Sequence, residues 1–278
     1  MNNNPLRQYF RRPAIYLKLP SKGIGYPPGS LDFSETGELP VFPMTAIDEL
    51  TSKTPDALYN GSAVPDIISS CIPAIKNPWD LRSDDLDAIL VAIRIASSGG
   101  TMEIETECPS CNETSKFDLN LSQLLSTFNA GAYEKLLTIG DLKFKFHSLS
   151  YRDANKHSIT QFELRRAFAQ ANIASLPEDE ASKVNASMMQ QINDQTISLM
   201  TDAIEYILVE DQKITDKDHI QEYLRNCDRK SFQVIRDTNI DMKKDSETKP
   251  LDIKCPACSH EYSQEFILNV SDFFDFDS

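Results

Sequence analysis

The chain has 278 residues, of which 40% are hydrophobic and 25% charged, and a formal net charge of −14. This length and composition are those of a globular protein that can bury one large core or two smaller ones. The acidic balance disfavours nucleic acid as a partner, because the phosphate backbone would repel such a surface. We expect no membrane span, since no run of about eighteen apolar residues occurs, and no secretory signal, since the start MNNNPLRQYFRRP lacks an apolar stretch.

The first thirty residues differ in charge from the rest of the chain. They contain five basic residues and no acid, which leaves −19 on the remainder, as −14 less +5. The segment combines aromatic and guanidinium groups, which are enriched at protein interfaces. We therefore predict a basic docking arm whose partner-binding residues are Arg7, Tyr9, Phe10, Arg11 and Arg12. A solvated tail leading into an edge strand is the alternative.

Beyond the arm, apolar residues alternate at Ile15, Leu17 and Leu19, which predicts a strand ended by Pro20. The sequence GIGYPPGS then predicts a turn-rich loop. It is not a phosphate-binding loop, because Pro28 stands where the third glycine of that motif belongs.

Two helices are predicted in the next segment. TPDALYNG has Pro55 at its first helical position and ends at Gly61. SDDLDAILVAIRIASSGG predicts the main helix of this half, capped by Ser83 and ended by Gly99. Its wide apolar face indicates a buried helix.

A β-hairpin follows further along. KLLTIGDLKFKFHSL predicts two strands joined by a turn at Gly140 and Asp141. Residues 150 to 244 are predicted to be helical and polar, including one long stretch from Leu176 to Val209.

Four of the six cysteines form two CPxC pairs, and the segments around them repeat. IETECPSC…FDLNLS and LDIKCPAC…FILNVS share a strand-like start, a CPxC turn and a second strand, so each predicts a β-hairpin. The other two, Cys71 and Cys227, are expected to be inert thiols, and the cysteine usage suits a reducing compartment.

The paired cysteines predict one structural zinc site. Zinc takes four tetrahedral ligands and thiolate is a common one, so neither pair is sufficient alone. The predicted ligands are Cys108, Cys111, Cys255 and Cys258, and the 143 residues between the pairs (255 − 111 − 1) become a largely helical insertion in a split zinc ribbon. His260 offers a variant with three cysteines and one histidine.

A thiol oxidoreductase is the competing interpretation of CPxC. Such enzymes place the motif between a strand and a helix, whereas here it occurs twice and a second strand follows each time. Many zinc knuckles have glycine after the second cysteine, where a left-handed residue is needed; this chain has Asn112 and Ser259 there. Four thiolates leave no open metal position, and no catalytic motif is present. We predict no enzymatic activity, no catalytic residues and no small-molecule substrate.

Together these features predict an α+β fold, mainly helical, with a split zinc ribbon flanking a long helical insertion. The expected organisation is a basic arm and strand at 1–30, a small helical region at 31–100, ribbon halves at 101–122 and 250–278, and a hairpin plus helical insertion at 123–249. The C-terminal SDFFDFDS is either an acidic-aromatic docking peptide or a segment whose Phe273, Phe274 and Phe276 pack on the zinc module.

The order of these segments resembles a known family. YLKLPSKG, VFPMTAIDELTSKTPDALYNG, ISSCIPAIKNPWDL, DDLDAILVAIRIASSGG and the two CPxC hairpins are similar to the baseplate hub and hub-assembly proteins of T-even-like contractile-tailed bacteriophages. The resemblance implies a late viral structural or chaperone-like assembly protein without enzymatic activity. It also implies tail and baseplate proteins as partners, and a location in the host bacterial cytoplasm during assembly or in the virion tail. A nucleic-acid-binding zinc-ribbon regulator remains the alternative from another class.

Overall fold

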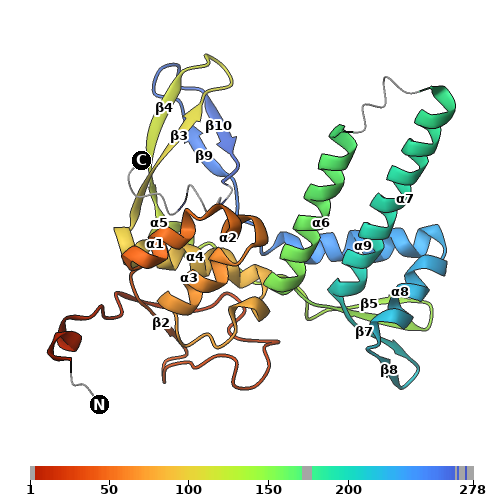
Figure 1. The fold of residues 1–278 in the computed structure, drawn as a ribbon, viewed down its shortest axis with the longest axis horizontal. Coiled ribbons are helices and arrows are strands. Elements are labelled where there is room, and N and C mark those ends of the chain that lie inside the picture. Colours follow the sequence, from red (N-terminus) through yellow and green to blue (C-terminus); the bar gives the residue numbers. More distant parts are fainter. Residues whose placement is uncertain (1–3, 171–176, 267, 269–272, 274–278) are drawn as a thin grey trace. The chain divides into compact units, whose positions relative to one another are not determined.

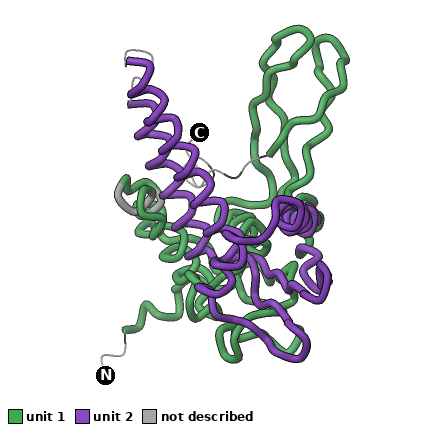
Figure 2. Tube along the Cα trace, turned by 90° about the vertical axis from the view of Figure 1, so that its right-hand side faces the viewer, with its two compact units in different colours: residues 1–130, 246–278 green, residues 131–245 purple. Residues whose placement is uncertain are grey.

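The computed structural model describes residues 4–170, 177–266, 268 and 273. It is an α+β protein of helices and small antiparallel sheets, which confirms the predicted fold class (Figure 1). The chain forms two compact units, residues 1–130 with 246–278 and residues 131–245 (Figure 2). The second unit is therefore an insertion in the first.

The first unit begins with a short 3-10 helix and a two-stranded sheet, and it contains five α-helices and both cysteine hairpins. Its elements are η1 (Pro5–Tyr9), β1 (Ile15–Leu17), β2 (Leu39–Val41), α1 (Ala46–Ser52), α2 (Pro55–Asn60), α3 (Ala63–Cys71), η2 (Pro78–Asp80), α4 (Ser83–Ser98), β3 (Thr101–Glu107), β4 (Thr114–Asn120), α5 (Leu121–Leu125), β9 (Leu251–Lys254) and β10 (Glu261–Gln264).

Helix α4 supplies much of the core of the first unit. Ile89, Val91 and Ile93 are fully buried, as its apolar pattern predicts. Gly99 ends the helix with φ of 94°, a conformation that costs glycine little. The predicted cap is wrong: Arg82 occupies the N-cap position, and Ser83 is already the first helical residue.

The first turn of α4 holds the fully buried carboxylate of Asp85. Asp85 accepts hydrogen bonds from the Ser21 amide at 2.8 Å, the Ser21 hydroxyl at 2.5 Å and the Tyr26 hydroxyl at 2.8 Å. Tyr26 belongs to the turn-rich loop GIGYPPGS and Ser21 comes just before it, so this carboxylate fixes the loop to the core. Burial raises the pKa of Asp85, and the hydrogen bonds from Ser21 and Tyr26 oppose that shift.

The second unit combines a four-stranded antiparallel sheet, in the order β5-β6-β7-β8, with four helices. Its elements are β5 (Leu136–Ile139), β6 (Leu142–Phe146), α6 (Tyr151–Gln170), α7 (Glu178–Ala203), β7 (Ile204–Val209), β8 (Gln212–Ile214), α8 (Lys217–Asn226) and α9 (Arg229–Lys244). The predicted hairpin with its turn at Gly140 and Asp141 is confirmed as β5–β6.

The prediction of an unbroken helix to Val209 is wrong at its C-terminal end. Helix α7 ends at Ala203, and the following IEYILV forms strand β7, paired with β6 from Leu142↔Val209 to Phe146↔Ile204. These six residues are mainly β-branched and aromatic, which favours a strand once a partner edge exists. Buried side chains from the sheet and helices form the core of this unit: Phe144, Phe146, Met200, Ile204, Ile207, Ile220, Leu224, Ile235 and Met242.

Helices α6 and α7 form an antiparallel pair whose two members are described in full. The His157 Nε2 lies 2.8 Å from an Asp202 carboxylate oxygen, and the Gln195 side-chain amide donates to the His157 carbonyl at 3.0 Å. These bonds join the pair at the end nearest the sheet. Among the described helices, none has both the length and the apolar character needed to cross a membrane.

Candidate metal centre

The two cysteine motifs lie at the turns of two separate hairpins. In the first, β3 pairs with β4 from Thr101↔Asn120 to Glu107↔Thr114, and in the second, β9 pairs with β10 from Leu251↔Gln264 to Lys254↔Glu261. The predicted hairpin repeat is therefore confirmed. The final LNVS of the second repeat lies largely outside the described residues.

The two turns have the same hydrogen bonds in the same register. The Cys108 amide donates to the Glu113 carbonyl at 3.0 Å, and the Asn112 amide donates to the Cys108 carbonyl at 2.9 Å. In the second hairpin, the Cys255 amide donates to His260 at 2.8 Å and the Ser259 amide donates to Cys255 at 2.9 Å. The repeat in sequence is thus a repeat in backbone geometry.

A left-handed residue closes each turn. Asn112 has φ of 55° and Ser259 has φ of 60° at equivalent positions, four residues after the first cysteine of each pair. The conformation that a knuckle glycine would normally supply is adopted here without glycine. Asparagine tolerates this conformation better than serine, so strain is expected mainly at Ser259.

The four sulfur atoms converge on one point. Cys108 Sγ and Cys258 Sγ lie 3.7 Å apart, Cys111 Sγ and Cys255 Sγ also lie 3.7 Å apart, and all four lie within 4.8 Å of one another. A tetrahedron with metal–sulfur bonds of about 2.3 Å has edges of about 3.8 Å. A disulfide would require about 2.0 Å, so the four thiols are free. The spacing fits a tetrahedral metal ion shared between the hairpins.

The sulfur environments alternate between buried and exposed. Cys108 and Cys255 are buried, whereas Cys111 and Cys258 are exposed. Desolvation opposes ionisation of Cys108, but the backbone amides of Ser110 and Cys111 donate to its sulfur and lower its pKa to about 7. An amide at Glu113 favours the thiolate of Cys111, yet its neighbouring sulfurs raise the pKa of that group to about 12. Four thiols this close cannot all ionise without a cation to offset their repulsion.

A small polar group joins the two hairpins beside the sulfurs. The buried Thr106 hydroxyl lies 3.1 Å from the Tyr262 hydroxyl and donates to the Gln264 side-chain oxygen at 3.4 Å. The His260 ring stacks on Tyr262, with centroids 6.2 Å apart. His260 is not part of the four-cysteine group.

The remaining cysteines lie apart from this cluster. Cys71 is fully buried in α3, and desolvation raises its pKa to about 12, which suits an inert thiol. Cys227 is half-buried, and desolvation raises its pKa as well.

The structure separates one residue of the predicted arm from the others. The Arg11 guanidinium donates to the Pro43 carbonyl at 2.5 Å and to the Ser70 carbonyl at 2.7 Å, and pairs with Asp48 at 3.3 Å. These internal contacts make it the anchor of the arm. The other four predicted residues are exposed: Arg7, Tyr9, Phe10 and Arg12.

The C-terminal aromatic segment is described only at one position. Phe273 is buried, and the Arg94 guanidinium of α4 lies 5.1 Å from its ring centroid. Its observed contact is therefore with a core helix. Phe274 and Phe276 lie outside the described residues.

A helical first unit with two cysteine hairpins, and a second unit inserted between them in the sequence, defines an α+β protein with a split four-cysteine ribbon. The family described as T4 bacteriophage base plate protein matches residues 18–275, and the chain belongs to that family. The resemblance read from the sequence is thereby confirmed. Neither a curated protein nor a solved structure matches this chain significantly.

Proposed function

We propose that this baseplate-family protein is a non-enzymatic structural or assembly component of the phage tail hub, stabilised by one zinc ion. The observation that carries the proposal is the convergence of four thiols from two distant hairpins, 3.7 Å apart in two cross-hairpin pairs. The ligands are Cys108, Cys111, Cys255 and Cys258.

The donor set favours a structural metal over a catalytic one. Four sulfur ligands complete a tetrahedral shell and leave no position for water or substrate, whereas catalytic zinc sites keep one position open. Zinc is the metal that tetrahedral thiolate sites typically select in a reducing compartment such as the host cytoplasm. The ion would join the two chain ends that flank the inserted unit, since one pair precedes residue 131 and the other follows residue 245.

The thiol oxidoreductase alternative is less well supported by this geometry. A redox pair needs its two cysteines close to each other and one of them accessible for exchange. Here the 3.7 Å contacts join cysteines of different hairpins, 150 and 144 residues apart in sequence. Four sulfurs around one centre suit a metal ion better than a pairwise disulfide.

The metal part of the proposal is tested on purified full-length protein. We expect about one zinc per chain by plasma emission spectrometry, retained through gel filtration with a weak chelator. Titration with p-hydroxymercuribenzoate should release that zinc as the four thiolates react. Protein without metal whose thiols cycle between dithiol and disulfide would instead support the oxidoreductase interpretation.

The exposed part of the arm is the proposed contact with other tail or baseplate proteins. Tyr9 is 78% and Phe10 57% exposed, between the cationic residues Arg7 and Arg12, and Arg11 fixes the base of the arm. Aromatic and guanidinium side chains supply most hot-spot energy at interfaces, so a short arm of this kind can dominate binding. The acidic surface elsewhere makes a protein partner more suitable than nucleic acid.

The assembly role is tested by tagged pull-down from infected cells. We expect baseplate or hub proteins to copurify with the wild type, and at least tenfold less with the double variant Tyr9→Ala, Phe10→Ala. Ile47→Ala is the control, because Ile47 is 74% exposed on α1, outside residues 1–30. Recovery unchanged in the double variant would reject the arm as the docking element. Absence of any tail protein with the wild type would count against the assembly role itself.

A further inference from the structure

Helices α6 and α7 form a long pair in the second unit, and few of their residues are buried. Of the 20 residues in α6, only His157 is buried, and the buried residues of the 26-residue α7 are confined to Met200, Thr201 and Ala203 near its C-terminal end. Helices of this kind owe their stability mainly to tertiary packing of an apolar face. A face of such length that the described residues leave exposed is a candidate interaction surface.

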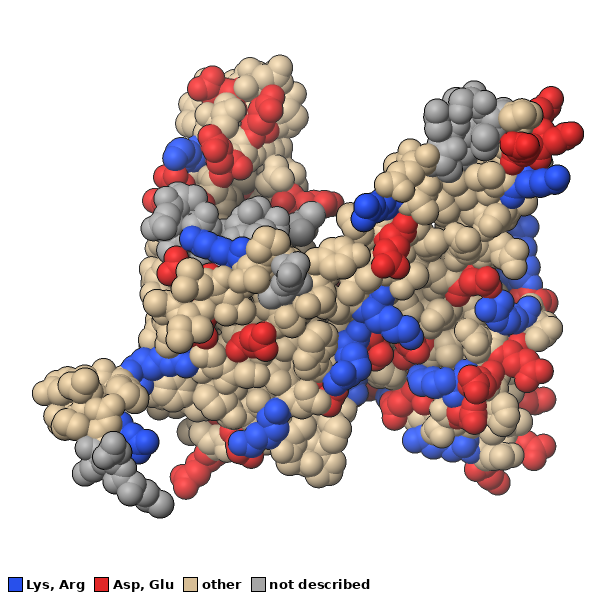
Figure 3. Space-filling view, viewed as in Figure 1, with Lys and Arg blue, Asp and Glu red and all other residues tan. Residues whose placement is uncertain are grey.

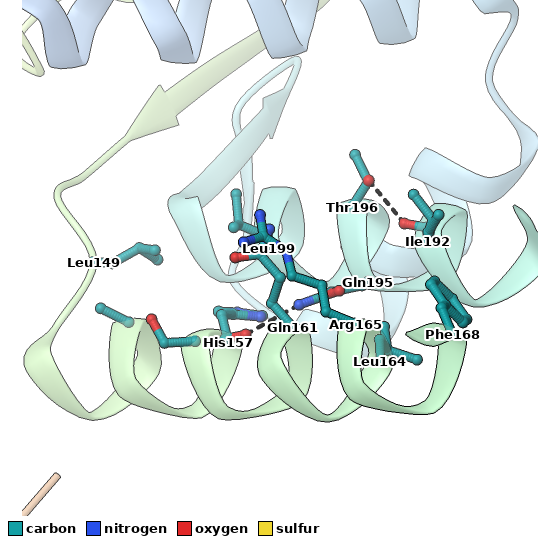
Figure 4. A pocket seen from close by; sticks show the side chains of 12 residues that line it. Leu149, His157, Gln161, Leu164, Arg165, Phe168, Ile192, Gln195, Thr196 and Leu199 are labelled. Carbon is teal, nitrogen blue, oxygen red and sulfur yellow. Dashed lines mark hydrogen bonds between the residues drawn. The ribbon is translucent and has the colours of Figure 1, made fainter. Parts of the chain in front are cut away.

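One side of this pair is an apolar groove of about 520 Å³ (Figure 4). Leu164 and Phe168 of α6 and Ile192 and Leu199 of α7 line it. The polar side chains of Gln161 and Gln195 lie between them (Figure 4). The groove therefore follows the seam between the two helices on one face.

Large apolar side chains extend this groove on both of its edges. Phe162, 53% exposed, lies four residues after Ser158 and three before Arg165, which both line the groove. Met189, 64% exposed, precedes the lining residue Ile192 by three. Residues three or four apart share a helix face, so these side chains border the same side. Exposed apolar side chains that lie side by side in this way mark a candidate interaction site.

The charges of the two helices are opposite. Helix α6 carries four basic and two acidic residues, a net charge of +2, whereas α7 carries one basic and five acidic residues, a net charge of −4. Asp194 and Asp202 of α7 are occupied by Arg225 and His157. The acids that remain gather at the start of α7 (Figure 3), and Arg165 and Arg166 stand near the end of α6.

We propose that this face binds the same face of a second copy of the chain and completes a four-helix bundle. In a two-fold pair whose axis runs along the helices, α6 of one copy faces α7 of the other. The Arg165 and Arg166 end then lies beside the acidic Glu178, Asp179 and Glu180 end of its partner, twice by symmetry. In the alternative dimer, the two-fold axis is perpendicular to the helices, so α6 faces α6 and α7 faces α7. The like net charges of the facing helices then repel at both contacts. The charges therefore favour a second copy of the chain as the partner, in the orientation that places α6 of one copy against α7 of the other.

The area of this face indicates what affinity to expect for the dimer. A 20-residue helix is about 30 Å long, and two helices packed about 10 Å apart present a face about 20 Å wide. This gives roughly 600 Å² per copy and roughly 1,200 Å² in total, the lower limit for a specific interface. The dimer should therefore form at micromolar concentration and dissociate on dilution.

The test is sedimentation velocity of the full-length protein between about 1 and 100 µM. We expect a monomer–dimer equilibrium that the double variant Met189→Glu, Ile192→Glu weakens at least a hundredfold. The matched control is Ile240→Glu, an apolar residue 49% exposed on α9, which should leave the equilibrium unchanged. Circular dichroism of each variant checks that its helices remain.

A charge exchange separates this geometry from other modes of self-association. Arg165→Glu, Arg166→Glu should weaken the dimer at least tenfold, and so should Glu178→Arg, Asp179→Arg, Glu180→Arg. A mixture of the two variants should form a heterodimer, because each basic helix then meets an acidic one. A wild type that stays monomeric at 100 µM overturns the proposal, as does a dimer insensitive to the groove variant or a mixture that does not associate. The outcome does not depend on the metal site or on tail partners.

Discussion

Replacing Cys255 by serine removes a buried sulfur that is 2% exposed and lies 3.7 Å from Cys111 Sγ. We expect this variant to lose its zinc and the cysteine hairpins to open locally. Holding together the ends of a flexible loop of 143 residues would cost about 4 kcal/mol, and the compact unit within these residues lowers that cost. Structural zinc contributes about 10–16 kcal/mol in small peptides, which exceeds that cost. Without the ion, the half-buried hairpin strands have little else to keep them closed.

The expected loss of local stability is at least about 4 kcal/mol, which corresponds to a roughly thousandfold faster amide exchange. Hydrogen exchange read by mass spectrometry measures it. The Asn112 and Ser259 amides, which donate across the two turns, should lose protection in peptides covering residues 101–120 and 251–264. Peptides covering β6 should exchange as in the wild type, because that strand belongs to the other unit.

Cys227→Ser is the control, since Cys227 lies outside the four-cysteine group. It should retain full zinc content and wild-type exchange. The shared-site reasoning fails if Cys255→Ser keeps a full complement of zinc, or if it loses zinc while both hairpins keep their protection.

Three further outcomes follow from the described contacts. Ser259→Gly should stabilise the second turn by about 0.5–1 kcal/mol, because glycine adopts φ near 60° without the clash that a β-carbon introduces. Amide exchange of residues 251–264 measures this change, and faster exchange in the variant would show that Ser259 is not strained. Burial raises the pKa of Asp85 above its value in the unfolded chain, so the contribution of Asp85 to stability falls as the pH rises from the unfolded pKa to the folded pKa. In urea unfolding from pH 4 to 8, the wild type should lose stability relative to Asp85→Asn as the pH rises. A relative gain in stability would refute the raised pKa. Phe146→Ala should lower the free energy of unfolding of the second unit by about 3–5 kcal/mol, because it removes a fully buried ring. A thermal midpoint equal to that of the wild type would contradict this packing.

Local sequence patterns were sufficient where the determining interactions are local. Gly99 ends α4 because the left-handed conformation there suits glycine. The Gly140–Asp141 turn fixes the pairing of β5 and β6, and the repeated CPxC turns predict two hairpins with the same register. The grouping of the cysteines was also predictable, since a half-complete ligand set requires the other half wherever the chain places it.

Patterns failed where a distant segment decides the outcome. The residues of β7 follow a long polar helix without a break signal, and they become a strand because the edge of β6 is available to pair with them. Asp85 lies in the first turn of α4, where an acid suits the helix dipole, yet residues 21–26 fold over it with two hydroxyls and an amide. Arg11 looks like its neighbours in the arm, yet a carboxylate and two carbonyls from residues 43–70 hold it.

The sequence by itself determined the α+β class, the four-cysteine set and the baseplate family, because composition, spacing and segment order are written along the chain. The tertiary structure alone decided which sulfurs approach each other across the hairpins, which arm residues remain exposed, and which face of α6 and α7 is left uncovered. These depend on contacts between residues tens to more than a hundred positions apart. Such contacts form only when the whole chain has chosen among its alternative packings, so no local pattern encodes them.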